Sequence, residues 1–89
     1  MFKSTLRKGF QMTFENGWTI SVQWGYGNYC DNRSFLQTDL DNTKDLECET
    51  AEIAMWDKDN KWFEFEYDTI KGHCTPDEVA DWIDKCRKF

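Results

Sequence analysis

The chain has 89 residues, a mass of 10.7 kDa and a formal net charge of −6 at pH 7. This length predicts a single domain over residues 1–89. We find no signal peptide and no apolar run near the roughly 18 residues of a membrane span, so we expect a cytoplasmic protein without a membrane partner. The negative charge argues against direct binding to nucleic acid.

Aromatic residues are abundant, with five Trp, three Tyr and seven Phe. This apolar content predicts a fold that does not depend on cross-links. The acidic residues are concentrated in residues 39–60, which contain eight carboxylates and only two lysines. Such a concentration is usually a solvated face, but it can also create a directional electric field.

Residues 9–24 are predicted to form a β-hairpin, because apolar and polar residues alternate on both sides of Asn16-Gly17. A two-residue turn would put the two apolar rows on opposite faces. A three-residue loop over residues 15–17 puts both rows on one face, with Phe14 opposite Trp18. This register predicts a left-handed conformation for Gly17.

The loop from Gly25 to Arg33 combines two glycines with aromatic and amide side chains. It lacks the Gly-Lys-Ser/Thr ending of a phosphate-binding P-loop. One interpretation is a packed loop that covers the end of the sheet. The other is a recognition loop, since loops on rigid scaffolds often carry binding residues. Its candidate binding residues are Tyr26, Asn28, Tyr29 and Arg33.

Residues 47–67 are predicted to form a second hairpin around Lys58-Asp59-Asn60, with Asn60 in the left-handed conformation. One face of this hairpin would carry the alternating residues Ala51, Ile53, Met55, Phe63, Phe65 and Tyr67. The other face would pair Trp56 with Trp62 and place Glu52, Glu64 and Glu66 around them. We expect this tryptophan pair to be partly exposed, unless the helix or the first hairpin buries it.

A helix is predicted from Thr75 to the C-terminus. Thr75 and Glu78 form a capping box around Pro76, and Cys74 with Val79 could form a hydrophobic staple. An apolar stripe follows at helical spacing, formed by Val79, Trp82, Ile83 and Cys86. The fold class is therefore α+β: an antiparallel sheet built from two β-hairpins, with one C-terminal amphipathic helix packed on its aliphatic and phenylalanine face.

The four cysteines are widely spaced at Cys30, Cys48, Cys74 and Cys86. We predict reduced structural thiols, since a zinc site normally contains a close ligand pair; disulfides and a metal are the alternatives. His73 precedes Cys74, but adjacent residues rarely reach the geometry of a catalytic pair. Residues 39–42 do not match a calcium loop. We predict no enzyme activity, no metal and no cofactor.

Four segments carry a resemblance: GFQMTFENGWTISVQWG (residues 9–25), GNYCDNR (27–33), AEIAMWD (51–57) and DEVA (77–80). Together they resemble a group of short uncharacterised proteins of bacteriophages and bacterial mobile DNA, over about two thirds of the chain. The group has no established activity, so it implies no site residue. It implies a context, because small acidic phage proteins are often antagonists of host proteins, sometimes by mimicking the charge of DNA.

The leading hypothesis is a small acidic, non-enzymatic interaction protein, a phage-type inhibitor that binds a host protein through aromatic and acidic residues. Its expected binding residues are Trp56, Trp62, Glu52, Glu64 and Glu66, together with those of the Gly25–Arg33 loop. The alternative is a small-ligand, nucleotide-type binding protein that uses this loop, with Arg33 on a phosphate. A zinc module is the third hypothesis.

Overall fold

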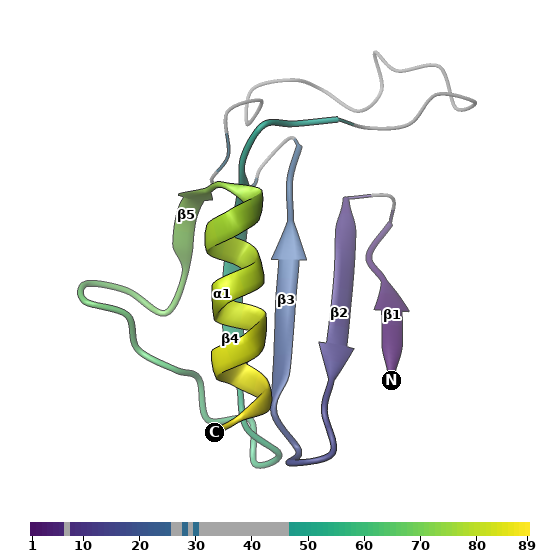
Figure 1. Cartoon of the computed structure of the whole chain (residues 1–89), viewed down its shortest axis with the longest axis vertical. Coiled ribbons are helices and arrows are strands. Elements are labelled where there is room, and N and C mark those ends of the chain that lie inside the picture. Colours follow the sequence, from purple (N-terminus) through teal and green to yellow (C-terminus); the bar gives the residue numbers. More distant parts are fainter. Residues whose placement is uncertain (7, 26–27, 29, 31–46) are drawn as a thin grey trace.

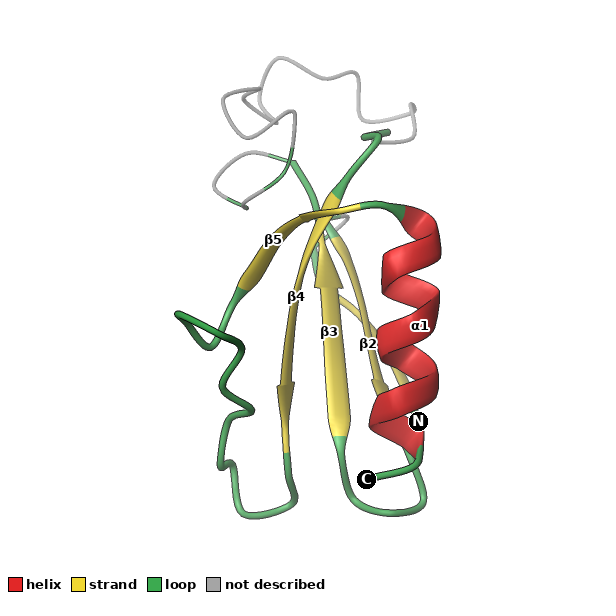
Figure 2. Cartoon of the chain, turned by 60° about the vertical axis from the view of Figure 1, so that its left-hand side comes forward, coloured by secondary structure: helices red, strands yellow, loops and turns green. Residues whose placement is uncertain are grey.

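The computed structural model describes residues 1–6, 8–25, 28, 30 and 47–89. These residues form one antiparallel sheet in the order β1-β2-β3-β4-β5 and one helix, α1, on one of its faces (Figures 1 and 2). The elements are β1 (Phe2–Ser4), β2 (Gly9–Thr13), β3 (Thr19–Gln23), β4 (Ala51–Trp56), β5 (Lys71–Cys74) and α1 (Pro76–Arg87). The predicted α+β fold class is confirmed.

The β2–β3 hairpin has the predicted register. Phe10 pairs with Val22 and Met12 with Ile20, so the two apolar rows share one face. Gly17 has a φ of 89°, and its N–H donates to the carbonyl of Phe14 at 3.0 Å. A left-handed residue in the third loop position is what the alternation of apolar residues required.

The core forms where β3 meets β4. Ile20 pairs with Met55 and Val22 with Ile53, so this pairing joins the apolar rows of both hairpins. Ile20, Ile53 and Met55 are each 0% exposed. Burial of such side chains contributes about 1.5–3 kcal/mol each, so this junction adds substantially to the stability of the fold.

The second hairpin is shorter than predicted. Asn60 has the predicted left-handed φ of 61°, and Trp56 and Trp62 form the predicted antiparallel bridge. Beyond Phe63, however, the chain leaves the sheet, and β5 takes the place beside β4. The prediction that Tyr67 belongs to the apolar row was wrong, because its side chain is 92% exposed.

Two interactions account for this departure. Phe65 packs edge-on against Trp82 of α1, with ring centroids 5.0 Å apart. The Phe65 N–H donates to the carbonyl of Asp68 at 2.8 Å, and the Asp68 carboxylate accepts from the N–H of Thr69. A tight turn thus forms where the alternation predicted a continuing strand, since aspartate side chains readily stabilise such turns.

The helix begins as predicted. The Glu78 N–H donates to Thr75 Oγ1, the Thr75 N–H donates to the Glu78 carboxylate, and Pro76 occupies the first turn. Val79 and Cys86 are buried in the core cluster, and Trp82 and Ile83 pack against it. The helix therefore covers the aliphatic and phenylalanine face, as predicted. It is too short and too polar to cross a membrane, and it is the sole helix in the described ranges.

The C-terminal end of α1 is held by the first hairpin. The side-chain amide of Asn16 donates to the carbonyls of Cys86 and Phe89, at 3.0 and 3.2 Å. The Phe89 ring packs against Trp18 and Phe63, with centroid distances of 4.7 and 5.4 Å. The hairpin loop thereby satisfies carbonyl groups that a helix end leaves without intrahelical partners.

Candidate interaction surface

The sheet face opposite α1 carries a pair of stacked indoles, which we call the tryptophan pair. Trp56 and Trp62 have ring centroids 4.8 Å apart and an interplanar angle of 27°. Trp56 is half-buried, whereas Trp62 is 44% exposed. Because Trp56 follows the buried Met55 on β4, strand alternation directs it away from the helix. The structure therefore brings the two predicted residues together and leaves one of them accessible.

We call the sheet surface around this pair the open face. Strand alternation and the register assign to it Lys3, Gln11, Thr13, Thr19, Ser21, Gln23, Glu52, Ala54 and Trp56. No helix or strand of the described residues covers it (Figure 2). Of these residues, only Glu52 and Trp56 were predicted from the sequence as binding residues. The other residues of this face could have been identified from the sequence, because they are the residues that alternate with the apolar ones along each strand.

The centre of the open face carries small side chains, and its polar groups are paired. Thr19, Ser21 and Ala54 are small side chains in the middle strands, and all three are buried by their neighbours. The hydroxyl groups of Thr13 and Thr19 lie 2.8 Å apart, and the Gln23 amide donates to Ser21 Oγ at 3.0 Å. Thr19 is also the direct cross-strand neighbour of Trp56. The indoles thus lie beside a surface made of small, mostly polar side chains.

The acidic residues divide into two groups. Glu52 lies on the open face, on the same strand as Trp56. Glu64 and Glu66 are exposed, but they follow the last bridge of the hairpin, so strand alternation no longer places them beside the indoles. Asp57 and Asp59 lie in the loop that joins the two tryptophans. Sequence reasoning did not select them, although their position next to Trp56 was visible.

The loop joining the two tryptophans is well ordered by hydrogen bonds. Asp57 Oδ1 accepts from the N–H groups of Asp59 and Lys61, at 2.9 and 3.0 Å. The N–H of Asn60 donates to the Asp57 carbonyl, and the N–H of Asp57 donates to the carbonyl of Lys61. These bonds fix the two ends of the loop relative to each other, and the two indoles stack directly beyond them.

The Gly25–Arg33 loop is described only in part. Asn28 is 8% exposed, and its side-chain amide donates to the Trp24 carbonyl at 2.9 Å. The Cys30 sulfur accepts from the N–H of Gly25 at 3.1 Å. The Asn28 amide therefore contacts the backbone at the end of β3. Tyr26, Tyr29 and Arg33, the other residues predicted for this site, lie outside the described residues.

Burial makes two of the cysteine thiols harder to ionise. Burial raises the pKa of the Cys86 thiol to about 11. Burial also raises the pKa of Cys74, and the charge of Glu78 adds to the increase while that of Lys71 opposes it. A reactive cysteine requires a lowered pKa, because the thiolate is the nucleophile. Neither thiol has the electrostatic environment of an activated nucleophile.

Two carboxylates of α1 are shifted in the opposite direction. Hydrogen bonds from Thr75 lower the pKa of Glu78 at the start of the helix. Hydrogen bonds from Lys88 and Arg87 lower the pKa of Asp84. Lys88 Nζ lies 2.9 Å from Asp84 Oδ2, and a guanidinium nitrogen of Arg87 lies 2.7 Å from Asp84 Oδ1. These groups stabilise the helix ends, and neither belongs to the open face.

The described residues contain no group of three or more His, Cys, Asp and Glu side chains arranged to hold a metal ion. Their four cysteines are free thiols, of which Cys48 is the least buried. Comparison of the chain with protein-family models, with curated proteins and with solved structures gave no match.

Proposed function

We propose that this chain is a small acidic, non-enzymatic interaction protein, a phage-type antagonist that binds a host protein through the tryptophan pair and nearby carboxylates. The observation that carries the proposal is the stacked Trp56–Trp62 pair, with Trp62 44% exposed on a sheet face that no described element covers. Exposed aromatic clusters in soluble proteins often mark interaction sites.

The two indoles offer a large apolar area for binding. A tryptophan buries about 150–250 Å² when it is fully covered, and tryptophans are enriched among the residues that dominate binding energies. Trp62 is already stacked on Trp56, and the loop between them is held by Asp57. Binding would therefore immobilise few additional rotamers, which lowers the entropic cost of association.

The charge of the chain indicates the kind of partner that it would bind. The chain carries a net charge of −6. Glu52, Asp57 and Asp59 lie on or beside the surface that holds the indoles, and Lys58 and Lys61 of the same loop offset part of their charge. The net negative charge of the chain would accelerate association with a basic surface and make binding sensitive to salt. The expected partner is accordingly a protein with a basic rim around an apolar cavity or groove.

The proposal is tested by capture from a bacterial lysate with three immobilised proteins: the wild type, the Trp56→Ala/Trp62→Ala double variant and Tyr67→Ala. Tyr67 is the matched control, because it is a 92% exposed aromatic residue in the segment that leaves the sheet. We expect one host protein to be retained by the wild type and by Tyr67→Ala, and to be lost with the double variant.

The retained protein is then purified and its binding measured at low and high salt. We expect at least tenfold weaker binding for Trp62→Ala, and weaker wild-type binding at high salt. Thermal unfolding of each variant shows that the fold is retained. Equal capture by the folded double variant, or a captured protein that ignores both indoles, would contradict the proposal.

A further inference from the structure

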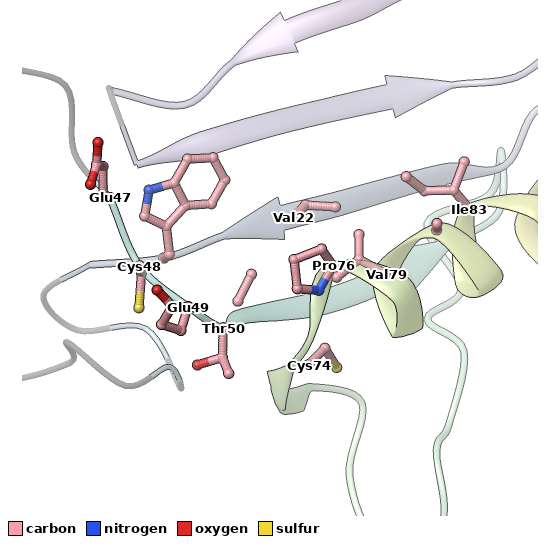
Figure 3. Close-up of a pocket in the computed structure, with 12 residues that line it drawn as sticks. Val22, Glu47, Cys48, Glu49, Thr50, Cys74, Pro76, Val79 and Ile83 are labelled. Atoms are coloured by element: carbon pink, nitrogen blue, oxygen red, sulfur yellow. The ribbon is translucent and has the colours of Figure 1, made fainter.

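A pocket of about 540 Å³ lies on the helix side of the sheet, away from the tryptophan pair (Figure 3). It is bounded by the first turns of α1, by the end of β3 and by residues 47–50, which lead into β4. Its volume falls within the roughly 300–1,000 Å³ typical of small-molecule sites. No sequence pattern predicted it, because its walls come from three separate parts of the chain.

The floor of the pocket is part of the core. Val22 on β3 and Val79 on α1 are 3% and 8% exposed, and Cys74 is buried beside them. Ala80 also lines the pocket, and its small side chain leaves space between helix and sheet. Because these residues belong to paired strands and a capped helix, the apolar floor exists before a ligand binds.

The two ends of the pocket differ in polarity. Figure 3 shows Glu47, Cys48, Glu49 and Thr50 together at one end, and Val22, Val79 and Ile83 toward the other. The described lining residues include the carboxylates of Glu47 and Glu49, both of which reach solvent. A ligand that matches both ends has an apolar body and a positive charge at one end.

We propose that this pocket binds a small apolar ammonium compound. Its hydrocarbon body would lie on Val22, Val79 and Ile83, and its ammonium group would lie near Glu47 and Glu49. Apolar contact provides most of the binding, and the carboxylates select for charge. The site lies on the opposite side of the sheet from the tryptophan pair, so its ligand and a protein partner could bind independently.

Three probes of equal size test the proposal: 4-phenylbutylamine, 4-phenylbutanol and 4-phenylbutyrate, which carry a positive, a neutral and a negative end group. Each is titrated into the full chain at pH 7, and amide chemical shifts are followed by NMR. We expect the amine to shift the amides of Thr50, Ala51, Val79 and Ala80, with a Kd at least tenfold lower than that of the butyrate.

Two variants refine the test. Ala80→Leu fills the pocket from an exposed helix position and should weaken binding of the amine at least tenfold. The Glu47→Gln/Glu49→Gln double variant should bring the affinities of the amine and the butyrate to within threefold of each other. Trp62→Ala is the control and should leave binding of the amine unchanged, so failure here is distinguishable from failure of the protein-binding proposal.

The proposal is overturned by any of four results. These are the absence of shifts with the amine, shifts confined to other residues, equal affinity for the amine and the butyrate in the wild type, and a preference for the amine that survives the double glutamine substitution. Each variant is checked by thermal unfolding. If Ala80→Leu is unstable, Ala80→Val provides the same steric test with a smaller side chain.

Discussion

The two faces of the sheet differ although they are built from adjacent residues of the same strands. On β4, Met55 is fully buried against the helix side, and the next residue, Trp56, belongs to an indole pair that reaches solvent. On β3, Ile20 lies in the core and its neighbour Thr19 lies on the open face. A single step along the chain therefore moves a side chain from the helix side of the sheet to the open face.

The largest expected effect is on the helix side. Met55→Ala should lower the free energy of unfolding by about 2–5 kcal/mol, because it removes a fully buried side chain and leaves a cavity. Urea denaturation followed by circular dichroism measures the loss. A change below about 1 kcal/mol would mean that the core can collapse around the missing side chain, and that the two faces differ less than the structure indicates.

A smaller effect is expected at the start of the helix that covers this face. Thr75→Ala should cost about 1 kcal/mol, because it removes the side chain that accepts the Glu78 N–H. Thr75→Ser, which retains the hydroxyl group, is the matched control and should cost less. Equal denaturation midpoints for the wild type and Thr75→Ala would show that the capping box adds no stability.

On the open face the expected loss of stability is again below that of Met55→Ala. Trp62→Ala should cost about 0.5–1.5 kcal/mol for the lost ring stacking, in addition to the loss of the apolar area that the partly hydrated side chain buries. The same denaturation experiment measures it beside Met55→Ala. A loss as large as that of Met55→Ala would make the tryptophan pair part of the core and would remove the basis for the proposed interface.

The smallest expected effect is a pH dependence of the free energy of unfolding, and it arises from Cys86 on the buried, helix side of the sheet. The pKa of Cys86 is raised from 9.0 to about 11 in the folded chain. The folded state then holds a proton that the unfolded state releases, so this stabilising contribution is complete below pH 9 and is lost as the pH rises toward 11.

Denaturation at pH 8 and pH 9.5 reaches only the beginning of this loss. We expect the wild type to lose more stability over this interval than Cys86→Ala, which has no titrating thiol at this position. Both proteins share every other titrating group, so the difference reports the thiol. Equal losses in the two proteins would show that Cys86 is solvated in the folded chain.

The features predicted correctly from the sequence are the local ones. The loop of residues 15–17 and the left-handed Asn60 follow from alternation on the two arms of each hairpin, and the helix start follows from Thr75, Pro76 and Glu78. In each case, residues close in the chain decide the structure, through turn geometry and backbone hydrogen bonds. The pairing of Trp56 with Trp62 is likewise decided locally, by the turn between them.

The features that required tertiary structure depend on residues far apart in the chain. The strand beside β4 is β5, because Phe65 packs on Trp82 and Asp68 turns the chain away before alternation can continue. The Asn16 amide binds carbonyls at the end of α1, 70 and 73 residues later. Strand alternation is satisfied by either partner for β4, so only the packing against the helix selects one.

The sequence by itself determined the α+β class, both hairpin turns, the helix and the tryptophan pair, since propensity, alternation and capping act within a few residues. Tertiary structure alone decided that Trp62 is exposed and that a pocket opens between α1 and residues 47–50. Exposure and cavities depend on which surfaces fail to meet when the elements pack. Packing between distant segments follows from the shapes of all the side chains involved, and no local pattern contains that information.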